Sequence, residues 1–322
     1  MAHLIEQMAY VGATPWHGLG SQLSPRQPLE VWQQEAGMNW QIQESPVHFM
    51  AGAAGHLGTI HTFPEQKVLY RSDTKAALSV VSQRYQIVQP RDVLEFYRDL
   101  TERSGYELET AGVLKGGRKL WALARTGQSA VLKGNDVVNG YLLLATSCDG
   151  TLATTATPTT IRVVCNNTLT IAVNGASQAI KVPHSTRFDP RAVKQQLGIT
   201  ISQWDDFMYR MRTLAARPVK THEAKDYLRS VLCEAQAANP ERAGISNERA
   251  LTKVLSMYEG HGRGAELEAA KGTAWGLLNA VTEYVDHERR ARNNEYRMDT
   301  AWFGQGAAIK QRALNTALQL VA

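Results

Sequence analysis

The sequence predicts an α+β protein with a β-hairpin-rich N-terminal half (an antiparallel sheet with packed helices) and a helical C-terminal half. Two turn dipeptides, Gly116-Gly117 and Asp149-Gly150, lie between strand-prone runs and supply the positive φ that tight hairpins need. Beyond Lys181 the apolar residues recur at helical spacing. We therefore expect a mixed α+β core with an N-terminal arm over residues 1–180. Residues 181–322 would form a helical region, packed on the same core or separate from it.

Composition places the chain among soluble globular proteins, with 43% hydrophobic and 20% charged residues. The longest apolar runs fall far short of the roughly 18 residues of a membrane span, and the N-terminus lacks the pattern of a secretory signal. The three cysteines, widely spaced and odd in number, argue against a disulfide framework. We expect a cytoplasmic protein in a reducing setting, without membrane contact.

In the N-terminal half, proline and glycine punctuation predicts an irregular arm over residues 1–28. Alternating apolar residues predict short strands within 38–70 and another over Leu78–Val88. Pro90 opens a predicted helix over Arg91–Arg103, which stops at Gly105. Residues 106–124 then read as a hairpin that turns at Gly116-Gly117.

The stretch 137–173 reads as two strands joined at Asp149-Gly150, followed by a mixed apolar and polar element. Pro158 is expected to stop the second strand, and the element from Ile161 carries Arg162, a cysteine and two asparagines. Polar groups inside an apolar run need partners, because burying them unsatisfied costs free energy. This stretch therefore belongs either to a specific framework or to a site.

Helical spacing predicts several helices in the C-terminal half: within 189–216, over 223–237 with Thr221 as N-cap, over 248–258 with Asn247 as N-cap, over 273–292 and over 305–320. The last two carry apolar stripes, made by Trp275, Leu278 and Val281 and by Ile309, Ala313 and Ala317. Each stripe must be buried, either on the chain's own core or against a neighbouring subunit.

The net charge of +5 is unevenly distributed: residues 1–70 sum to −3, residues 71–130 to +3 and residues 181–230 to +5. Concentrated positive charge is what a surface for phosphate backbones needs, although solvated helix faces show it too. Aromatic residues stand beside several of the basic ones, as in platforms that stack single-stranded bases. The candidate nucleic-acid-binding residues are Arg84, Tyr85, Arg118, Lys119, Trp121, Arg162, Arg210 and Arg212. The alternative interpretation of Arg162, which we favour slightly over a DNA contact, is an internal ion pair or a guanidinium that caps carbonyl groups.

Motifs for enzymatic chemistry are missing from the sequence. The run 112–119 lacks the Lys and Ser/Thr of a phosphate-binding loop, and no strand is expected before 260–264, so that run does not fit a dinucleotide fingerprint. No cysteine pair has zinc spacing, and no serine nucleophile elbow is present. His287 with Asp286 and Glu283 could suggest an acid–base group or a metal site, but a charged helix is the interpretation we favour. We expect no cofactor, no metal and no catalytic residue.

Four stretches together resemble a known family: residues 15–20 (PWHGLG), 80–88 (VVSQRYQIV), 162–169 (RVVCNNTL) and 272–287, which begins GTAWG. They are similar to the phage/plasmid-like proteins built on domain of unknown function 932. That resemblance implies a protein of mobile genetic elements and supplies no activity. Hairpins crossing on Asp-Gly-Thr before a helix are also similar to phage single-strand annealing proteins. Those proteins bind DNA in the basic groove of a homo-oligomeric ring or filament without a nucleotide cofactor.

Three functions remain as hypotheses. The first is a non-enzymatic protein of a phage or plasmid that binds single-stranded DNA and promotes annealing or recombination. The second is an enzyme acting on nucleic acid or nucleotide, with Trp16-His17 and Asn166-Asn167 near a scattered active site. The third is a structural or anti-defence factor whose partner is another protein.

Overall fold

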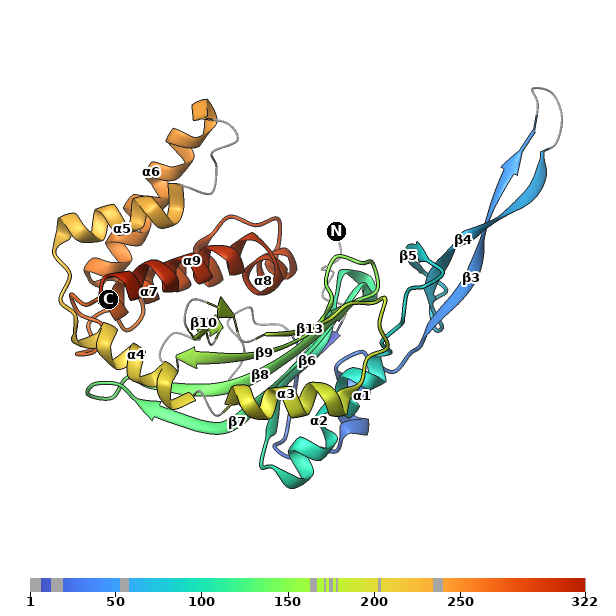
Figure 1. Cartoon of the computed structure of the whole chain (residues 1–322), viewed down its shortest axis with the longest axis horizontal. Helices are drawn as coiled ribbons and strands as arrows, with labels where there is room; N and C mark the ends of the chain where they lie inside the picture. Colours follow the sequence, from blue (N-terminus) through green and yellow to red (C-terminus); the bar gives the residue numbers. More distant parts are fainter. Residues whose placement is uncertain are drawn as a thin grey trace. The chain divides into compact units, whose positions relative to one another are not determined.

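The computed structural model describes residues 7–12, 20–52, 58–162, 167–170, 172–173, 176–177, 179–201, 204–233 and 240–321 (Figure 1). The N-terminal half is mostly β-sheet with a few helices, and residues 190–319 are mainly helical. The predicted α+β class is confirmed.

The larger sheet has the strand order β10-β9-β8-β7-β6-β1-β2, with β13 also pairing with β9. Its strands are β1 (Gln7–Val11), β2 (Ser21–Leu23), β6 (Glu107–Leu114), β7 (Lys119–Val131), β8 (Val137–Ser147), β9 (Thr154–Arg162), β10 (Asn167–Thr170) and β13 (Ile180–Val182). β1 and β2 are parallel, whereas β6 pairs antiparallel with both β1 and β7. The hairpin predicted at Gly116-Gly117 is confirmed, and both glycines have positive φ, 66° and 106°.

A second sheet has the order β3-β4-β5 and is antiparallel, with β3 spanning Ile42–Ala51, β4 Thr59–Arg71 and β5 Ala77–Ser82. The strands expected within 38–70 are confirmed, but they are long rather than short and pair as one hairpin. The strand expected over Leu78–Val88 ends at Ser82, because the chain turns there and the amide of Tyr85 bonds back to the carbonyl of Ser82. A short pair, β11 (Ala172–Val173) and β12 (Ala176–Ser177), completes the strands of the described residues.

The helices are α1 (Leu29–Glu35), α2 (Pro90–Arg103), α3 (Pro190–Ile201), α4 (Trp204–Ala216), α5 (Thr221–Cys233), α6 (Pro240–Ser256), α7 (Ala274–Glu283), α8 (Asn294–Phe303) and α9 (Gln305–Gln319). Single wide turns, Met257–His261 and Tyr284–Glu288, extend α6 and α7. The run 189–216 contains two helices, α3 and α4. α6 begins at Pro240, so Asn247 lies inside the helix rather than at its N-cap. Neither α1 nor α8 was predicted.

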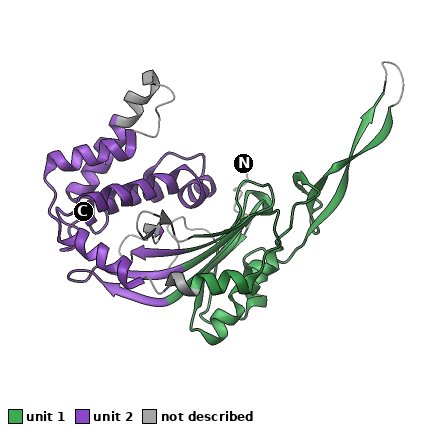
Figure 2. Cartoon of the chain, in the orientation of Figure 1, with its two compact units in different colours: residues 1–126, 142–157, 179–197 green, residues 127–141, 158–178, 198–322 purple. Residues whose placement is uncertain are grey.

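By contact density the chain divides into two compact units (Figure 2). Unit 1 comprises residues 1–126, 142–157 and 179–197, and unit 2 comprises residues 127–141, 158–178 and 198–322. β7, β8 and β9 each contribute residues to both units. A domain boundary near residue 180 stays a prediction.

In unit 1, Tyr97 of α2 forms hydrogen bonds with the backbone of β7 and β8 in the larger sheet. Its side chain is fully buried, and its hydroxyl lies 2.9 Å from the carbonyl oxygens of Ala122 and Leu142 and accepts a hydrogen bond from the amide of Leu144. Val93, Leu94 and Phe96 on the same helix are also buried. The helix begins as predicted, with Pro90 in its first turn and a capping box between Gln89 and Asp92.

The core of unit 2 contains both apolar stripes of the late helices. Trp275, Leu278 and Val281 of α7 are at most 2% exposed, and Ile309, Ala313 and Ala317 of α9 at most 7%. The hydroxyl of Tyr227 on α5 donates a 2.8 Å hydrogen bond to the carbonyl of Ala313. These stripes are therefore covered by the chain's own core. The sequence left open whether a neighbouring subunit covers these stripes. The structure gives no support for association of subunits through them.

Pro158 lies inside β9, and the expectation that it stops the strand is wrong. On one side of β9, β13 pairs with Thr154–Ala156 and β10 pairs with Thr159–Arg162. Pro158 falls at the change of partner, where its missing N–H interrupts neither ladder.

The Asp149-Gly150 connection is longer than the two-residue turn that was predicted. Only Gly150 has positive φ, and the Asp149 carboxylate accepts hydrogen bonds from the amide and hydroxyl of Thr151.

Candidate nucleic-acid interface

The predicted site residues separate by burial. In unit 1, Arg84 and Arg118 are exposed and Tyr85 is half-buried, whereas Lys119 and Trp121 on β7 are 5% and 1% exposed. In unit 2, Arg212 is exposed, Arg210 is half-buried and Arg162 is 3% exposed. Five of the eight are thus accessible to a ligand: Arg84, Tyr85, Arg118, Arg210 and Arg212. Lys119, Trp121 and Arg162 point into the protein.

Arg162 forms the internal ion pair that was the alternative prediction. Its Nε and one terminal nitrogen each bond a carboxylate oxygen of Asp136 at 2.7 Å, and Asp136 is fully buried. The guanidinium also donates to the carbonyl of Gly264 at 3.0 Å. The indole of Trp275 donates to the same carboxylate at 3.0 Å. This network joins the end of β9, the β7–β8 connection, the 260–264 loop and α7 within unit 2.

Tyr85 holds the β8–β9 connection in unit 1. Its hydroxyl donates a 2.7 Å hydrogen bond to the carbonyl of Ser147, and its ring stacks on His184 with centroids 4.4 Å apart. The two ring nitrogens of His184 lie 3.1 Å and 3.0 Å from the carbonyl oxygens of Gln86 and Leu152. One face of the Tyr85 ring is therefore already occupied by a stacking partner.

Cys148, in the same connection, is unsuited to nucleophilic chemistry. It is 4% exposed, and its thiol lies 3.5 Å from the carbonyl of Gly117 and 3.6 Å from that of Arg118. Burial raises the pKa of this thiol to about 12. Because the thiolate is the reactive form, the cysteine is inert at neutral pH.

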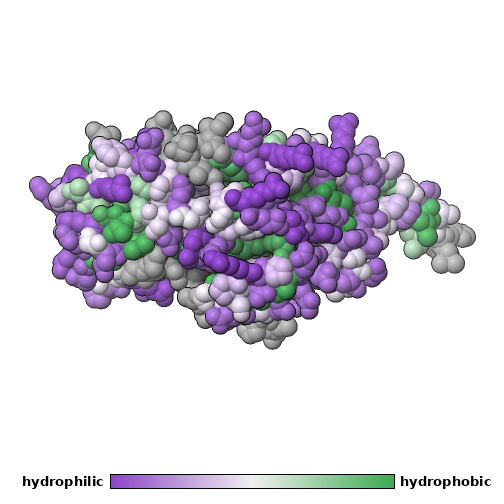
Figure 3. Space-filling view, turned by 90° about the horizontal axis from the view of Figure 1, so that it is seen from below, coloured by the Kyte–Doolittle hydropathy of each residue, from purple (hydrophilic) through white to green (hydrophobic). Residues whose placement is uncertain are grey.

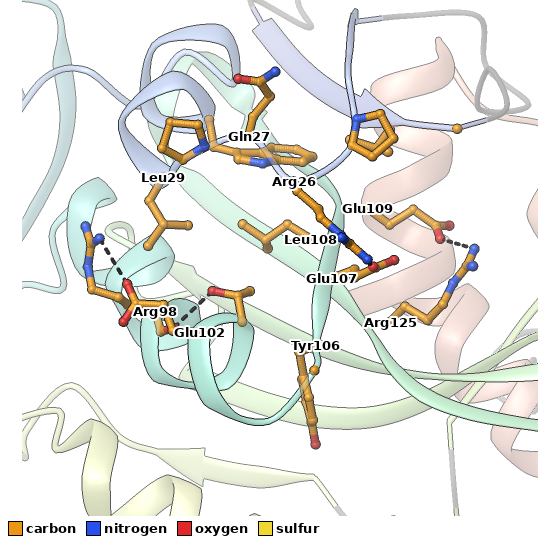
Figure 4. A pocket seen from close by; sticks show the side chains of 17 residues that line it. Arg26, Gln27, Leu29, Arg98, Glu102, Tyr106, Glu107, Leu108, Glu109 and Arg125 are labelled. Carbon is orange, nitrogen blue, oxygen red and sulfur yellow. Dashed lines mark hydrogen bonds and ion pairs between the residues drawn. The ribbon is translucent and has the colours of Figure 1, made fainter.

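A pocket of about 650 Å³ opens in unit 1 between the chain around residues 25–29, α2 and β6 (Figure 4). Its three arginines face glutamates. Arg125 and Glu109 form an ion pair of 2.7 Å, Arg98 contacts Glu102 at 3.6 Å, and Arg26 approaches Glu107 at 3.8 Å. The charges of the lining balance, and the lining residues in the described chain include no Ser, Cys, His or Lys. Such a pocket does not attract anions strongly, because its positive and negative charges cancel.

A second pocket, of about 470 Å³ in unit 2, has the opposite character. It lies between the end of the α7 extension and the start of α8 and is lined by Arg289, Arg290, Ala291, Arg292, Tyr296 and Thr300. The guanidinium of Arg292 lies 5.6 Å from the centroid of the Tyr296 ring. The amide of Tyr296 donates to the Asn293 side chain, which caps α8. Three guanidinium groups in a lining that, among the described residues, holds no carboxylate make this pocket, here called the arginine pocket, suited to anions.

The acidic groups noticed near His287 serve the framework. Asp286 forms a buried 2.7 Å ion pair with Lys310, and Glu283 accepts a 2.9 Å hydrogen bond from the amide of Arg263. Burial raises the pKa of Glu283. Within the described ranges, no group of three or more His, Cys, Asp or Glu is placed to hold a metal ion.

The sequence does not single out the arginine pocket, because Arg289, Arg290 and Arg292 fit the basic C-terminal end of a charged helix. Their dense spacing, 289, 290 and 292 followed by Tyr296, was the available signal. Trp16-His17, Cys165 and Asn166 lie outside the described residues, and Asn167 begins β10.

The fold and the arginine pocket define an α+β protein with a cationic surface site. Residues 77–302, more than two thirds of the chain, match DUF932, a domain of unknown function. The protein belongs to the DUF932 family. No curated protein and no solved structure gives a significant match to this chain. No helix in the described part of the chain is long and apolar enough to cross a membrane.

Proposed function

We propose that this protein binds single-stranded DNA through its backbone, without catalysis, as a component of a phage or plasmid. The observation that supports the proposal is the arginine pocket, which is lined by three arginines and Tyr296 and, among the described residues, by no carboxylate. Exposed Arg84 and Arg118 in unit 1, and Arg210 and Arg212 in unit 2, would add further phosphate contacts. Strand annealing by a homo-oligomeric ring or filament is the activity we propose for the assembled protein.

The chemistry of the arginine pocket favours a phosphate diester beside a base. A guanidinium offers two parallel N–H donors to a phosphate, and its charge releases condensed counterions on binding. Tyr296 is 36% exposed and could stack a base. The larger pocket of unit 1 has paired charges, so it does not compete for the same ligand.

The test is fluorescence anisotropy with a labelled single-stranded oligonucleotide across a salt series. For the wild type, the logarithm of affinity should fall with the logarithm of salt concentration, with a slope of about −0.7 per phosphate neutralised. Replacing Arg290 and Arg292 together by Ala should weaken binding and make that slope shallower by about 1.4, because two contacts are lost.

The matched control removes two arginines from the charge-balanced pocket, Arg26→Ala with Arg125→Ala, and should leave affinity and slope nearly unchanged. Equal loss in both double variants would indicate a general charge effect rather than a site. An absence of wild-type binding at low salt would remove the proposal altogether.

A further inference from the structure

β3 and β4 continue beyond β5 as a two-stranded ribbon. β5 pairs with β4 only over Gln66–Tyr70, whereas Val47–Ala51 of β3 pairs with Thr59–Phe63 of β4 further out. We call the residues 47–51 and 59–63 the β-arm. An isolated two-stranded ribbon is marginally stable in water. The β-arm is therefore a segment whose stability would gain from a partner.

Both faces of the β-arm expose large apolar side chains. On one face Met50 and Ile60 are cross-strand neighbours and are 69% and 73% exposed. On the other, Phe49 is 50% and Phe63 38% exposed, and Phe49 stacks on His61 with centroids 5.4 Å apart. Figure 3 shows green, hydrophobic surface near the end of the molecule where Figure 1 draws β3 and β4. Contiguous exposed apolar surface on two faces is typical of an interaction site.

The charge of this segment restricts the kind of partner. Residues 45–64 contain no Lys, Arg, Asp or Glu, although charged residues make up 20% of the chain. Nucleic-acid backbones are bound by cationic side chains, so the β-arm is unsuited to them. A strongly charged protein surface would lose hydration against it without gaining an ion pair. The fitting partner is itself uncharged and apolar.

The strand edges restrict the partner further. Pro46 and Pro64 stand at the base of the ribbon, but neither proline nor a charged residue interrupts Val47–Ala51 or Thr59–Phe63. Edges without such residues can pair with another strand. Hydrocarbon could not satisfy their N–H and C=O groups, which disfavours insertion of a lone ribbon into a bilayer. A protein strand satisfies them by extending the sheet.

We propose that the β-arm docks on the β-arm of a second copy of this chain, edge to edge, to form one continuous sheet across the two subunits. The β-arm is its own complement, because it is uncharged and its apolar cross-strand pairs can continue those of an identical ribbon. A two-fold contact of this kind is isologous: each copy contributes the same residues. The interface does not depend on the arginine pocket or on DNA.

Sedimentation velocity across micromolar concentrations of the full chain tests the proposal. The wild type should show a species at twice the monomer mass of 35.6 kDa or a higher multiple. Ile60→Glu places a charge in the β-arm and should weaken association at least tenfold. Val80→Glu is the matched control: Val80 is 54% exposed on β5 of the same sheet but outside the β-arm, so association should persist.

A second variant separates association from folding. Phe49→Thr with Ile60→Thr removes apolar surface while keeping good strand formers, so the melting temperature should stay near that of the wild type while association weakens. A monomeric wild type, or equal association in the wild type and Ile60→Glu, would overturn the proposal. So would flotation of the wild type, but not of Ile60→Glu, with neutral phosphatidylcholine vesicles, because the occupant would then be lipid.

Discussion

The carboxylate of Asp136 is shared by two side chains far away in the sequence, the guanidinium of Arg162 and the indole of Trp275. Arg162 contributes two hydrogen bonds of 2.7 Å and Trp275 one of 3.0 Å. Removing a buried charge from water costs free energy, and this arrangement offsets the cost with several directed contacts. Arg162 and Trp275 each lie in a stretch that carries the family resemblance, so this resemblance reflects, at least here, a structural framework.

Arg162→Ala should lower the free energy of unfolding by about 3–5 kcal/mol, because it leaves the Asp136 carboxylate buried with only the indole as a side-chain donor. Arg162→Met with Asp136→Leu should cost less than the sum of the single changes, since both charges leave together. Urea denaturation of the wild type, of Arg162→Met, of Asp136→Leu and of the double variant measures this coupling. A normally stable Arg162→Ala protein with weakened DNA binding would contradict the framework role.

The sequence predicted the elements whose signals are local. Pro90 and the apolar face of Val93, Leu94 and Phe96 define α2, and Gly116-Gly117 defines a hairpin, because helix starts and tight turns depend on neighbouring residues. The class and most helices followed from such signals.

Partners across long sequence separations could not be predicted. Arg162 meets Asp136 and the carbonyl of Gly264 only after the sheet and the late helices have assembled. The prediction for Pro158 was wrong because β9 tolerates a proline at this position, between the residues that pair with β13 and those that pair with β10. The sequence does not show where these two partners meet. Lys119 and Trp121 are buried because of how other elements pack around β7. Their side-chain types alone, a cation beside an aromatic ring, also fit an exposed site for nucleic acid.

Cys148 should make stability sensitive to alkaline pH. The pKa of its thiol is raised to about 12 in the folded protein, so between roughly pH 9 and 12 only the unfolded chain releases this proton. Stability from this group is present below about pH 9 and is lost as pH rises. The unfolding free energy of the wild type relative to Cys148→Ala should fall by about 2 kcal/mol between pH 8 and 10.5.

Urea titrations of both proteins at the two pH values give this difference in the free energy of unfolding. The contributions of other titratable groups are the same in the two proteins and therefore cancel. A difference that stays constant with pH would show that the thiol titrates alike in the folded and unfolded states.

Tyr296 should contribute to DNA binding through its ring. Tyr296→Ala should weaken affinity about tenfold, within the range of about 1–3 kcal/mol for a stacked base, and should leave the salt slope unchanged because no charge is removed. Tyr296→Phe keeps the ring and should bind like the wild type. Anisotropy titrations decide this, and equal affinity of the Ala and Phe variants would exclude stacking on this ring.

Two glycines of one motif should respond to alanine for different reasons. At Gly276, in the first turn of α7, an added Cβ would overlap the carbonyl oxygen of Ala270. At Gly272 it would meet no atom within 4 Å, but the residue has φ +67°. Alanine usually favours a helix over glycine by about 1 kcal/mol, yet an overlap with backbone cannot be relieved by a rotamer change.

Gly276→Ala should therefore lower the free energy of unfolding by about 3 kcal/mol, and Gly272→Ala by about 1 kcal/mol, the cost of the left-handed conformation. Urea denaturation compares the two, with near-ultraviolet circular dichroism as a reporter of the packing of buried aromatic side chains such as Trp275. The signal should change in Gly276→Ala and persist in Gly272→Ala. Equal destabilisation would mean that the motif is limited by backbone conformation and not by the close approach of α7 to the preceding turn.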